Sequence, residues 1–148
     1  MEKGRSRGGA VTVPADSSGV RALLKTLKLG GNIMILPDQV PGKGDGVWAD
    51  FFGRPAYTMT LLPRLAESTG AKVVFFFAER LAKGMGYHVH FIPMETLFDN
   101  DKEKASQQTN EMVEKLIRMA PTQYLWSYNR YKHPAGAPLP PLYPEEGS

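Results

Sequence analysis

The stretch AKVVFFFAERLAKGMGYHVHFIP, residues 71–93, decides the fold class of this chain. Residues 71–80 are apolar rather than alternating, which predicts a strand that is covered on both faces. Residues 86–93 alternate between polar and apolar side chains and predict the next strand. A turn around Lys83 and Gly84 joins the two strands.

Three amphipathic segments predict helices around these strands. The first starts at a capping residue among Asp16, Ser17 and Ser18 and stops at Gly30-Gly31. The second starts at Thr58 or Thr60, carries Pro63 in its first turn and stops at Gly70. The third spans residues 101–119 and is ended by Pro121. We expect the third helix to face inward with Met112, Leu116 and Ile117.

The order of elements indicates an α/β fold. Residues 32–36, NIMIL, predict a short buried strand, so the order is helix, strand, helix, strand, strand, helix. This order predicts a mixed sheet with helices packed over it. The proline-rich residues 134–148 carry no core pattern and predict a surface strap or a disordered tail.

Composition restricts the classes of function. The 148 residues, of which 42% are hydrophobic and 22% charged, suit one globular domain. The absence of cysteine excludes disulfides and thiolate metal sites and fits a reducing compartment. A net charge of +3 points only weakly to an anionic partner. The longest apolar run, residues 73–78, is far short of the ~20 residues that a bilayer requires, and no signal peptide is visible.

A glycine-rich loop follows the strand predicted at residues 32–36, and Asp38 and Gln39 lie at the exit of that strand. Ligands gather at the carboxyl ends of strands in α/β sheets, so Asp38 is a candidate site residue. A turn-capping aspartate explains it equally well. The three glycines of residues 42–46 run into an extended segment rather than a helix, which argues against a nucleotide-binding loop.

The three histidines allow two further interpretations. His88 and His90 share one strand face and form a possible zinc pair, but a third imidazole ligand exists only at His133, and we favour solvent-facing polar side chains. His90 and Glu95 match H-x-x-x-x-[DE], an acyl-transfer pattern in which a carboxylate orients a basic imidazole. Pro93 lies inside that match and breaks the helix it would need, so we interpret it as a chance match.

Several segments together resemble a known family. They are VRALLKTLKLGGNIMILPDQ, GVWADFFGRPAYTMT, LAESTGAKVVFFFAER, GYHVHFIP and NEMVEKLIRMAPTQYLWSYNRYK, in this order. Over about residues 5–133 the chain resembles the C-terminal half of the bacterial lipid A biosynthesis (late, Kdo-dependent) acyltransferases, in the lysophospholipid acyltransferase superfamily. The resemblance divides the chain into the C-terminal portion of an acyltransferase domain, residues 1–133, and a proline-rich tail, residues 134–148.

The resemblance implies a fold and an activity. The fold is part of a glycerol-3-phosphate-acyltransferase-like arrangement. The family transfers a fatty acyl chain from acyl carrier protein, or sometimes acyl-CoA, to a hydroxyl of a lipid A precursor, without a metal or prosthetic group. Implied partners are acyl carrier protein, an anionic lipid and the cytoplasmic face of the inner membrane, with no nucleic acid. We expect this chain to be soluble or peripheral.

The resemblance also implies site residues. Asp38 matches the family's supporting aspartate, and Arg5 or Arg7 its arginine. The family's catalytic histidine lies upstream of these positions, so we expect a fragment that is inactive alone. A non-catalytic lipid- or carrier-binding module is the alternative. The expected substrate-binding residues are Gln39, Gly46, Trp48, Phe51, Phe52, Gly53, Thr58 and Arg80.

For two groups of side chains, the sequence leaves more than one role possible. Trp48, Phe51 and Phe52 either line an acyl groove or touch the edge of the bilayer, and for the two phenylalanines packing in the core is an equal alternative. The basic residues either meet lipid phosphates or cover ordinary surface. They are Arg64, Arg118, Arg130 and Lys132.

Overall fold

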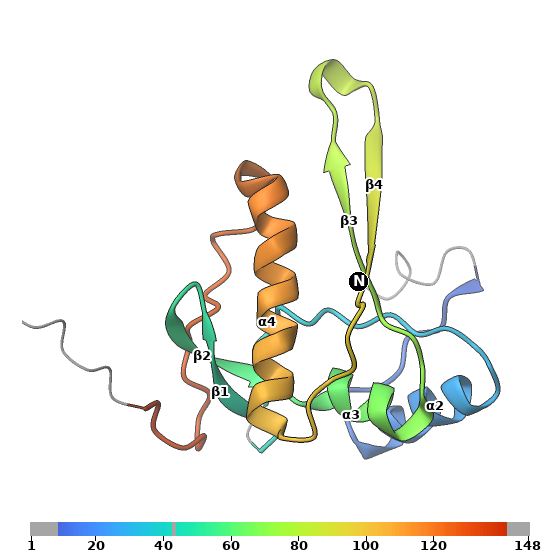
Figure 1. The fold of residues 1–148 in the computed structure, drawn as a ribbon, viewed down its shortest axis with the longest axis vertical. Coiled ribbons are helices and arrows are strands. Elements are labelled where there is room, and N and C mark those ends of the chain that lie inside the picture. The colour runs from blue at the N-terminus through green and yellow to red at the C-terminus, as the bar shows by residue number, and fades with distance from the viewer. Residues whose placement is uncertain (1–8, 43, 142–148) are drawn as a thin grey trace, which may run out of the picture. The chain divides into compact units, whose positions relative to one another are not determined.

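The computed structural model describes residues 9–42 and 44–141. The chain forms two compact units, Met1–Ile35 and Leu36–Ser148. The first unit contains helix α2 (Ser17–Lys28) (Figure 1). The Asp16 carboxylate caps it by accepting hydrogen bonds from the backbone N–H groups of Ser18 and Gly19, at 2.8 and 3.1 Å. The predicted first helix and its cap are therefore confirmed.

The second unit begins with a β-hairpin. Strand β1 (Gly46–Phe51) pairs antiparallel with β2 (Arg54–Met59). Phe52 and Gly53 form the connecting turn, with φ values of 50° and 73°. A two-residue turn with both φ values positive matches the right-handed twist of the paired strands.

A helix and a second hairpin follow. Helix α3 (Leu61–Thr69) ends at Gly70, whose φ of 68° gives the left-handed cap that glycine favours. Strand β3 (Val74–Arg80) then pairs antiparallel with β4 (Tyr87–Pro93) through the short 3-10 helix η2 (Ala82–Gly84). These elements confirm the second predicted helix, both predicted strands and the turn between them.

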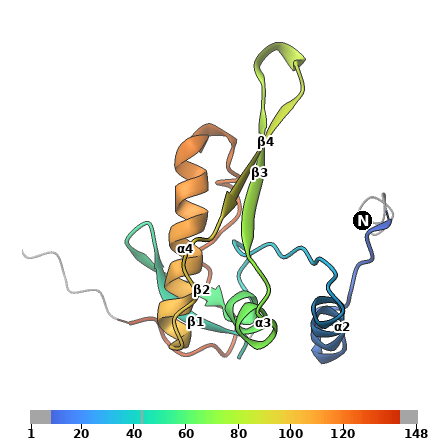
Figure 2. The same ribbon diagram turned by 45° about the vertical axis from the view of Figure 1, so that its right-hand side comes forward.

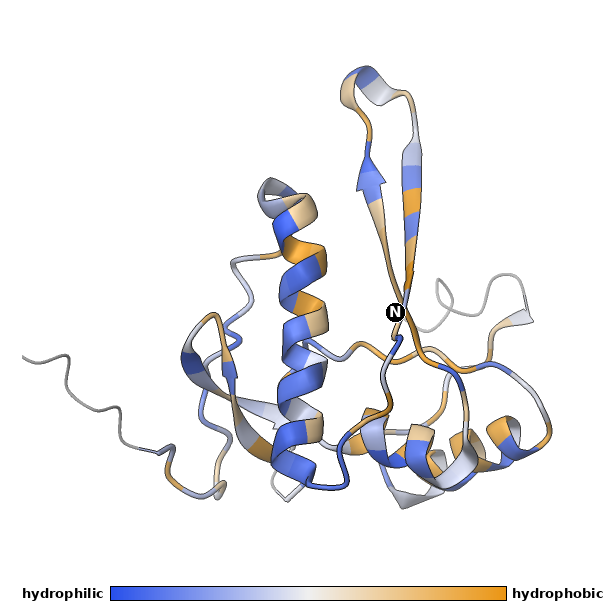
Figure 3. Cartoon of the chain, in the orientation of Figure 1, coloured by the Kyte–Doolittle hydropathy of each residue, from blue (hydrophilic) through white to orange (hydrophobic). Residues whose placement is uncertain are grey.

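Helix α4 (Lys102–Met119) and the 3-10 helix η3 (Pro121–Gln123) complete the second unit. Helix α4 packs on the β1–β2 hairpin and alongside β3 (Figures 1 and 2). Its apolar stripe, visible in Figure 3, meets residues from both hairpins. The predicted inward face is confirmed, because Leu116 and Ile117 are buried and Met112 packs against them. The buried core cluster consists of Phe51, Ala56, Phe75, Val113, Leu116 and Ile117.

Two expectations are wrong. Residues 32–36 form no strand, since no described strand pairs with them, and Met34 is 67% exposed. Strand β3 is covered on one face only, and Phe76 is 48% exposed. Successive side chains point to opposite faces, and α4 packs against only one of them.

The α/β class is confirmed; in place of the one mixed sheet that was predicted, the described strands form two separate two-stranded antiparallel sheets. The glycerol-3-phosphate-acyltransferase-like arrangement stays a prediction. Among the described residues, none of the helices combines the length and apolar character needed to cross a membrane.

Candidate functional site

Asp38 lies in a half-buried turn, residues 37–39, at the start of the second unit. Just past this turn, the backbone N–H of Val40 donates a hydrogen bond to the Tyr128 hydroxyl at 2.9 Å. Tyr128 belongs to residues 124–131, which follow η3. The turn that carries Asp38 is therefore held by a segment nearly ninety residues further along the chain.

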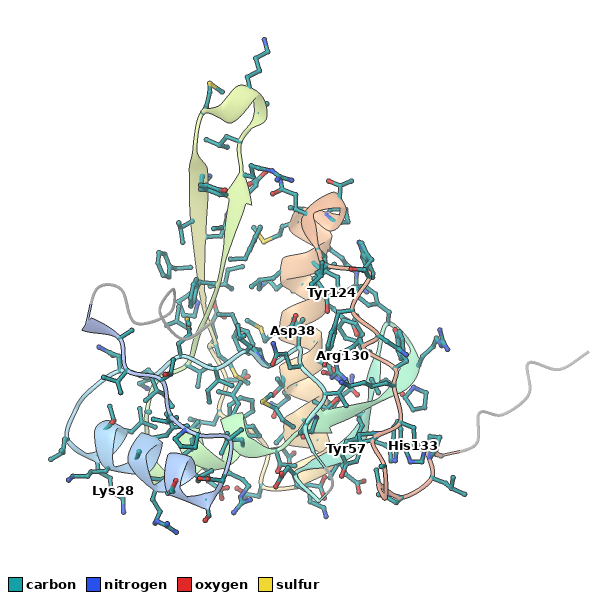
Figure 4. The ribbon with its side chains drawn as sticks, turned by 180° about the vertical axis from the view of Figure 1, so that it is seen from behind. Lys28, Asp38, Tyr57, Tyr124, Arg130 and His133 are labelled. Carbon is teal, nitrogen blue, oxygen red and sulfur yellow. The ribbon has the colours of Figure 1, made fainter. Side chains whose placement is uncertain are left out.

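Tyr124 lies beside Asp38, on the same side of α4 (Figure 4). Its hydroxyl is buried and makes no hydrogen bond of good geometry within the described residues, although the Asp38 carboxylate is close enough to interact with it. Burial, reinforced by the neighbouring Asp38 carboxylate, raises the pKa of Tyr124 to about 12. The phenol therefore keeps its proton at physiological pH and can donate it to a hydrogen bond.

Arg130 is almost fully buried, with 3% of its surface exposed. Its guanidinium donates to the Tyr57 carbonyl oxygen at 2.9 Å, to the Thr58 hydroxyl at 2.8 Å and to the Asn110 side-chain oxygen at 3.0 Å. These contacts join residues 124–131 to β2 and to α4. The planar guanidinium holds its N–H donors in a fixed geometry, which suits three acceptors at fixed positions. The single ammonium group of a lysine does not.

Thr58 and Asn110 complete a buried polar group with Arg130, which we name the Arg130 cluster. The Asn110 amide donates to the Thr58 hydroxyl and to the Asp50 carbonyl oxygen, both at 2.9 Å. The Thr58 hydroxyl donates in turn to the Ala56 carbonyl oxygen at 2.9 Å. The cluster links β1, β2, α4 and residues 124–131, so it fixes the frame on which Asp38 and Tyr124 lie.

The charge of Arg130 is not cancelled by a contact ion pair. Within residues 9–42 and 44–141, no carboxylate lies within 4 Å of its guanidinium. Burial lowers the pKa of Arg130, while the neighbouring Tyr124, Tyr128 and Asp38 side chains raise it. Asp38 is the carboxylate among these neighbours and stabilises the buried cation at longer range.

The arrangement places one carboxylate beside a phenol donor and a buried cation. A carboxylate that is held in a fixed position can orient an imidazole base or accept a hydrogen bond from a hydroxyl. This chemistry suits a reaction in which a hydroxyl group loses its proton.

The profile of the bacterial lipid A biosynthesis acyltransferase family matches residues 1–133. The chain belongs to this family. It is 34% identical to the lipid A biosynthesis lauroyltransferase of Escherichia coli K12 over 126 residues, which cover 83% of this chain and 41% of that protein. It is 30% identical to the Escherichia coli K12 lipid A biosynthesis palmitoleoyltransferase over 134 residues, 88% of this chain and 42% of that protein. The chain thus spans about two-fifths of the length of these two relatives.

The structure brings together only part of the set predicted from the lipid A acyltransferase resemblance. Asp38 lies at the site with Tyr124 and Arg130, whereas Arg5 and Arg7 lie outside the described residues. Phe51 and Thr58 are fully buried, which favours packing over substrate contact. The predicted binding roles of these side chains stay predictions.

The β1–β2 hairpin explains two more of the predicted residues, Gly46 and Trp48. A Cβ at Gly46 would lie 2.7 Å from the Thr58 carbonyl oxygen, so this glycine permits a close backbone approach. The Trp48 indole N–H donates to the Pro138 carbonyl oxygen at 2.9 Å. Residues 134–141 therefore strap over β1, as one interpretation of the tail predicted.

The remaining predicted binding residues lie at the surface or in turns. Gln39 is exposed next to Asp38. Phe52 and Gly53 form the β1–β2 turn, where the Phe52 N–H donates to the Glu114 carboxylate at 2.7 Å. The exposed Arg80 exchanges two backbone hydrogen bonds with the Gln123 side chain, at 2.8 and 3.1 Å.

Four basic residues were left between a role at lipid phosphates and ordinary surface, and Arg130 fits neither alternative, because it is buried in the protein interior. Arg64, Arg118 and Lys132 are exposed. The His90 imidazole contacts Glu79 at 2.7 Å, which agrees with the interpretation of the Glu95 match as chance.

Sequence reasoning missed Tyr124, Tyr128 and Asn110. Asn110 lies at helical spacing within the inward stripe of α4, which also contains Ser106, Val113 and Ile117. A polar residue inside an apolar stripe indicates a buried hydrogen-bond network. The tyrosines lie in residues 124–131, which carry neither helical nor alternating periodicity, and no local pattern shows that they return to Asp38.

Proposed function

We propose that this chain provides the Asp38 portion of the acyl-transfer site of a lipid A acyltransferase. The observation that carries the proposal is that Asp38 is held by residues 124–131, beside Tyr124 and the buried Arg130, in a chain of this family. The names of the relatives, which include lauroyl- and palmitoleoyltransferases, support lipid A as the pathway.

The reaction transfers a fatty acyl chain from a thioester to a hydroxyl of a lipid A precursor. The hydroxyl oxygen bonds to the acyl carbon, the carbon–sulfur bond breaks, and the hydroxyl proton passes through a base to the leaving thiolate. We propose acyl carrier protein as the donor, with acyl-CoA as the alternative. In this scheme Asp38 positions the reacting groups and does not itself bond to the acyl carbon.

We further propose that the chain is inactive alone. The histidines it contains are engaged away from Asp38: His90 contacts Glu79, His88 stacks on His90, and His133 contacts the Ala137 carbonyl oxygen at 3.0 Å. Without a basic imidazole at the hydroxyl, the rate is expected to fall by ~10²–10⁴.

The experiment replaces the matching 126 residues of the Escherichia coli lauroyltransferase with this chain and measures acyl transfer from acyl carrier protein. The chimera should be active and lose activity in Asp38→Asn, because the amide no longer carries the negative charge. Asp50→Asn, which changes an exposed carboxylate of β1, is the matched control. An Asp38→Asn chimera as active as the control would sink the proposal, and turnover by the chain alone would contradict its inactivity.

A non-catalytic lipid-binding role is favoured by one surface patch. Trp126 is 57% exposed, its ring lies against Phe52, and the Arg118 guanidinium lies over the Phe52 ring at 4.9 Å. An exposed indole next to an arginine suits the polar boundary of a membrane. We propose a peripheral location at the cytoplasmic face of the inner membrane. Sedimentation with anionic vesicles tests this role, and Trp126→Ala should weaken it.

A further inference from the structure

We propose that the β3–β4 hairpin carries a binding site for a divalent transition metal, Zn²⁺ above all, formed by Glu79, His88 and His90. One ligand atom from each residue lies within 4.8 Å of the others. Two imidazole nitrogens and one carboxylate oxygen are a donor set that Zn²⁺ uses in proteins. The site is separate from Asp38 and does not depend on the proposed acyl transfer.

The pairing of the strands builds this set. His88 and His90 are two positions apart on β4, so both side chains project from the same face. Glu79 on β3 is the direct cross-strand partner of His88 and is diagonal to His90. Residues opposite each other on one face of an antiparallel pair have neighbouring side chains. The three donors therefore lie together on one face of the hairpin, within 4.8 Å of one another.

Aromatic contacts hold the imidazoles in place. The His90 ring stacks on Phe77 with centroids 4.7 Å apart and planes 11° apart. The His88 ring stacks on His90 at 4.2 Å. The side chain of the half-buried His90 has little room to rotate, whereas that of the exposed His88 has more. The exposure of His88 also leaves a path by which an ion can enter.

The short contact between Glu79 and His90 is where the metal would act. Their carboxylate oxygen and imidazole nitrogen are 2.7 Å apart, a hydrogen-bond distance. Zn²⁺ binds such atoms at about 2.0–2.2 Å each, so the ion would replace this hydrogen bond and move the two atoms slightly apart. Water completes the coordination, and the ion cross-links the two strands of the hairpin.

A simple ion pair between Glu79 and His90 is the competing interpretation. It accounts for the 2.7 Å contact but gives His88 no role on the same face. The two interpretations differ in what His88→Ala does. The variant removes a metal ligand under our proposal, but it leaves the pair intact.

The experiment titrates the 148-residue protein, prepared without an oligohistidine tag, with Zn²⁺ against a chromophoric chelator. We expect one Zn²⁺ per chain, with affinity reduced at least about tenfold in His88→Ala and in Glu79→Gln, since even outer-shell changes cost 10–100-fold. His133→Ala is the matched control, because His133 lies outside the hairpin and should leave the affinity unchanged. Zn²⁺ should also raise the melting temperature of the wild type more than that of His88→Ala.

Circular dichroism checks that each variant folds. Because His88 is exposed, its removal leaves no cavity, and His88→Ala keeps the test interpretable even if Glu79→Gln is unstable. Binding that is absent in the wild type, unchanged in His88→Ala, or lost in His133→Ala overturns the proposal.

Discussion

The backbone N–H of Val40 donates a hydrogen bond to the hydroxyl of Tyr128 at 2.9 Å, across a sequence separation of 88 residues. This bond ties the Asp38 turn to the segment that also contributes Tyr124 and Arg130. The position of the candidate supporting acid is thus set by tertiary contacts and not by the strand that the sequence predicts before it.

Tyr128→Phe should loosen the Asp38 turn. The substitution keeps the ring but removes the acceptor of the Val40 N–H, and a half-buried donor left unpaired costs about 1–3 kcal/mol. Amide hydrogen exchange should become faster at Val40 than elsewhere in the second unit. Tyr87→Phe, which alters an exposed tyrosine of β4, is the control. Unchanged protection of Val40 would show that the hydrogen bond does not hold the turn.

Arg130→Lys should destabilise the protein by about 2–4 kcal/mol in urea unfolding. The single ammonium group of a lysine cannot donate to all three acceptors on Tyr57, Thr58 and Asn110. At least one buried acceptor is therefore left without a hydrogen bond. Arg64→Lys, on the exposed side of α3, should change the free energy of unfolding by less than about 0.5 kcal/mol. Equal effects of the two substitutions would contradict a structural role for Arg130.

Local patterns were sufficient for the helices and for the β3–β4 hairpin. Capping residues and glycines determine where α2 and α3 begin and end, and the apolar spacing of α4 gives its buried face. These features depend on residues within one turn or one strand of each other. The PDQ block of the family resemblance also predicts Asp38 as a site residue, and its role stays a prediction.

Long-range contacts explain what the sequence did not predict. The segment at residues 32–36 has strand composition, but a strand also requires a hydrogen-bonded partner, and none of the described strands pairs with it. Arg130 looks like a surface arginine in a polar segment, yet it is buried because Thr58 and Asn110 supply acceptors from distant elements. Neither outcome follows from a window of neighbouring residues.

Gly46→Ala should destabilise the second unit by about 1–3 kcal/mol, as overpacking typically does. The added Cβ would lie 2.7 Å from both the Thr58 carbonyl oxygen and the Pro41 ring. Moving the backbone away from this clash would cost free energy. Gly42→Ala is the matched control, because its Cβ would meet nothing closer than 3.7 Å. Thermal unfolding of the two variants measures the difference. If Gly46→Ala is as stable as the control, close backbone packing does not explain Gly46, and its predicted role in substrate binding is the better explanation.

Tyr124 should ionise with a pKa of about 12, above the 10.0 of an ordinary tyrosine. Absorbance at the tyrosinate band, recorded in rapid pH jumps, should show a late phase that is absent from Tyr124→Phe. Asp38→Asn should lower the pKa of Tyr124 without returning it to 10.0, because burial is the larger cause. Asp50→Asn should leave it unchanged.

The same shift gives a pH dependence of stability. The folded protein holds the Tyr124 proton more tightly than the unfolded chain, so this contribution is complete below pH 10 and is lost as the pH rises toward 12. The free energy of unfolding should therefore fall more steeply between pH 10 and 12 in the wild type than in Tyr124→Phe. Identical slopes would mean that the phenol is not buried beside Asp38 in solution.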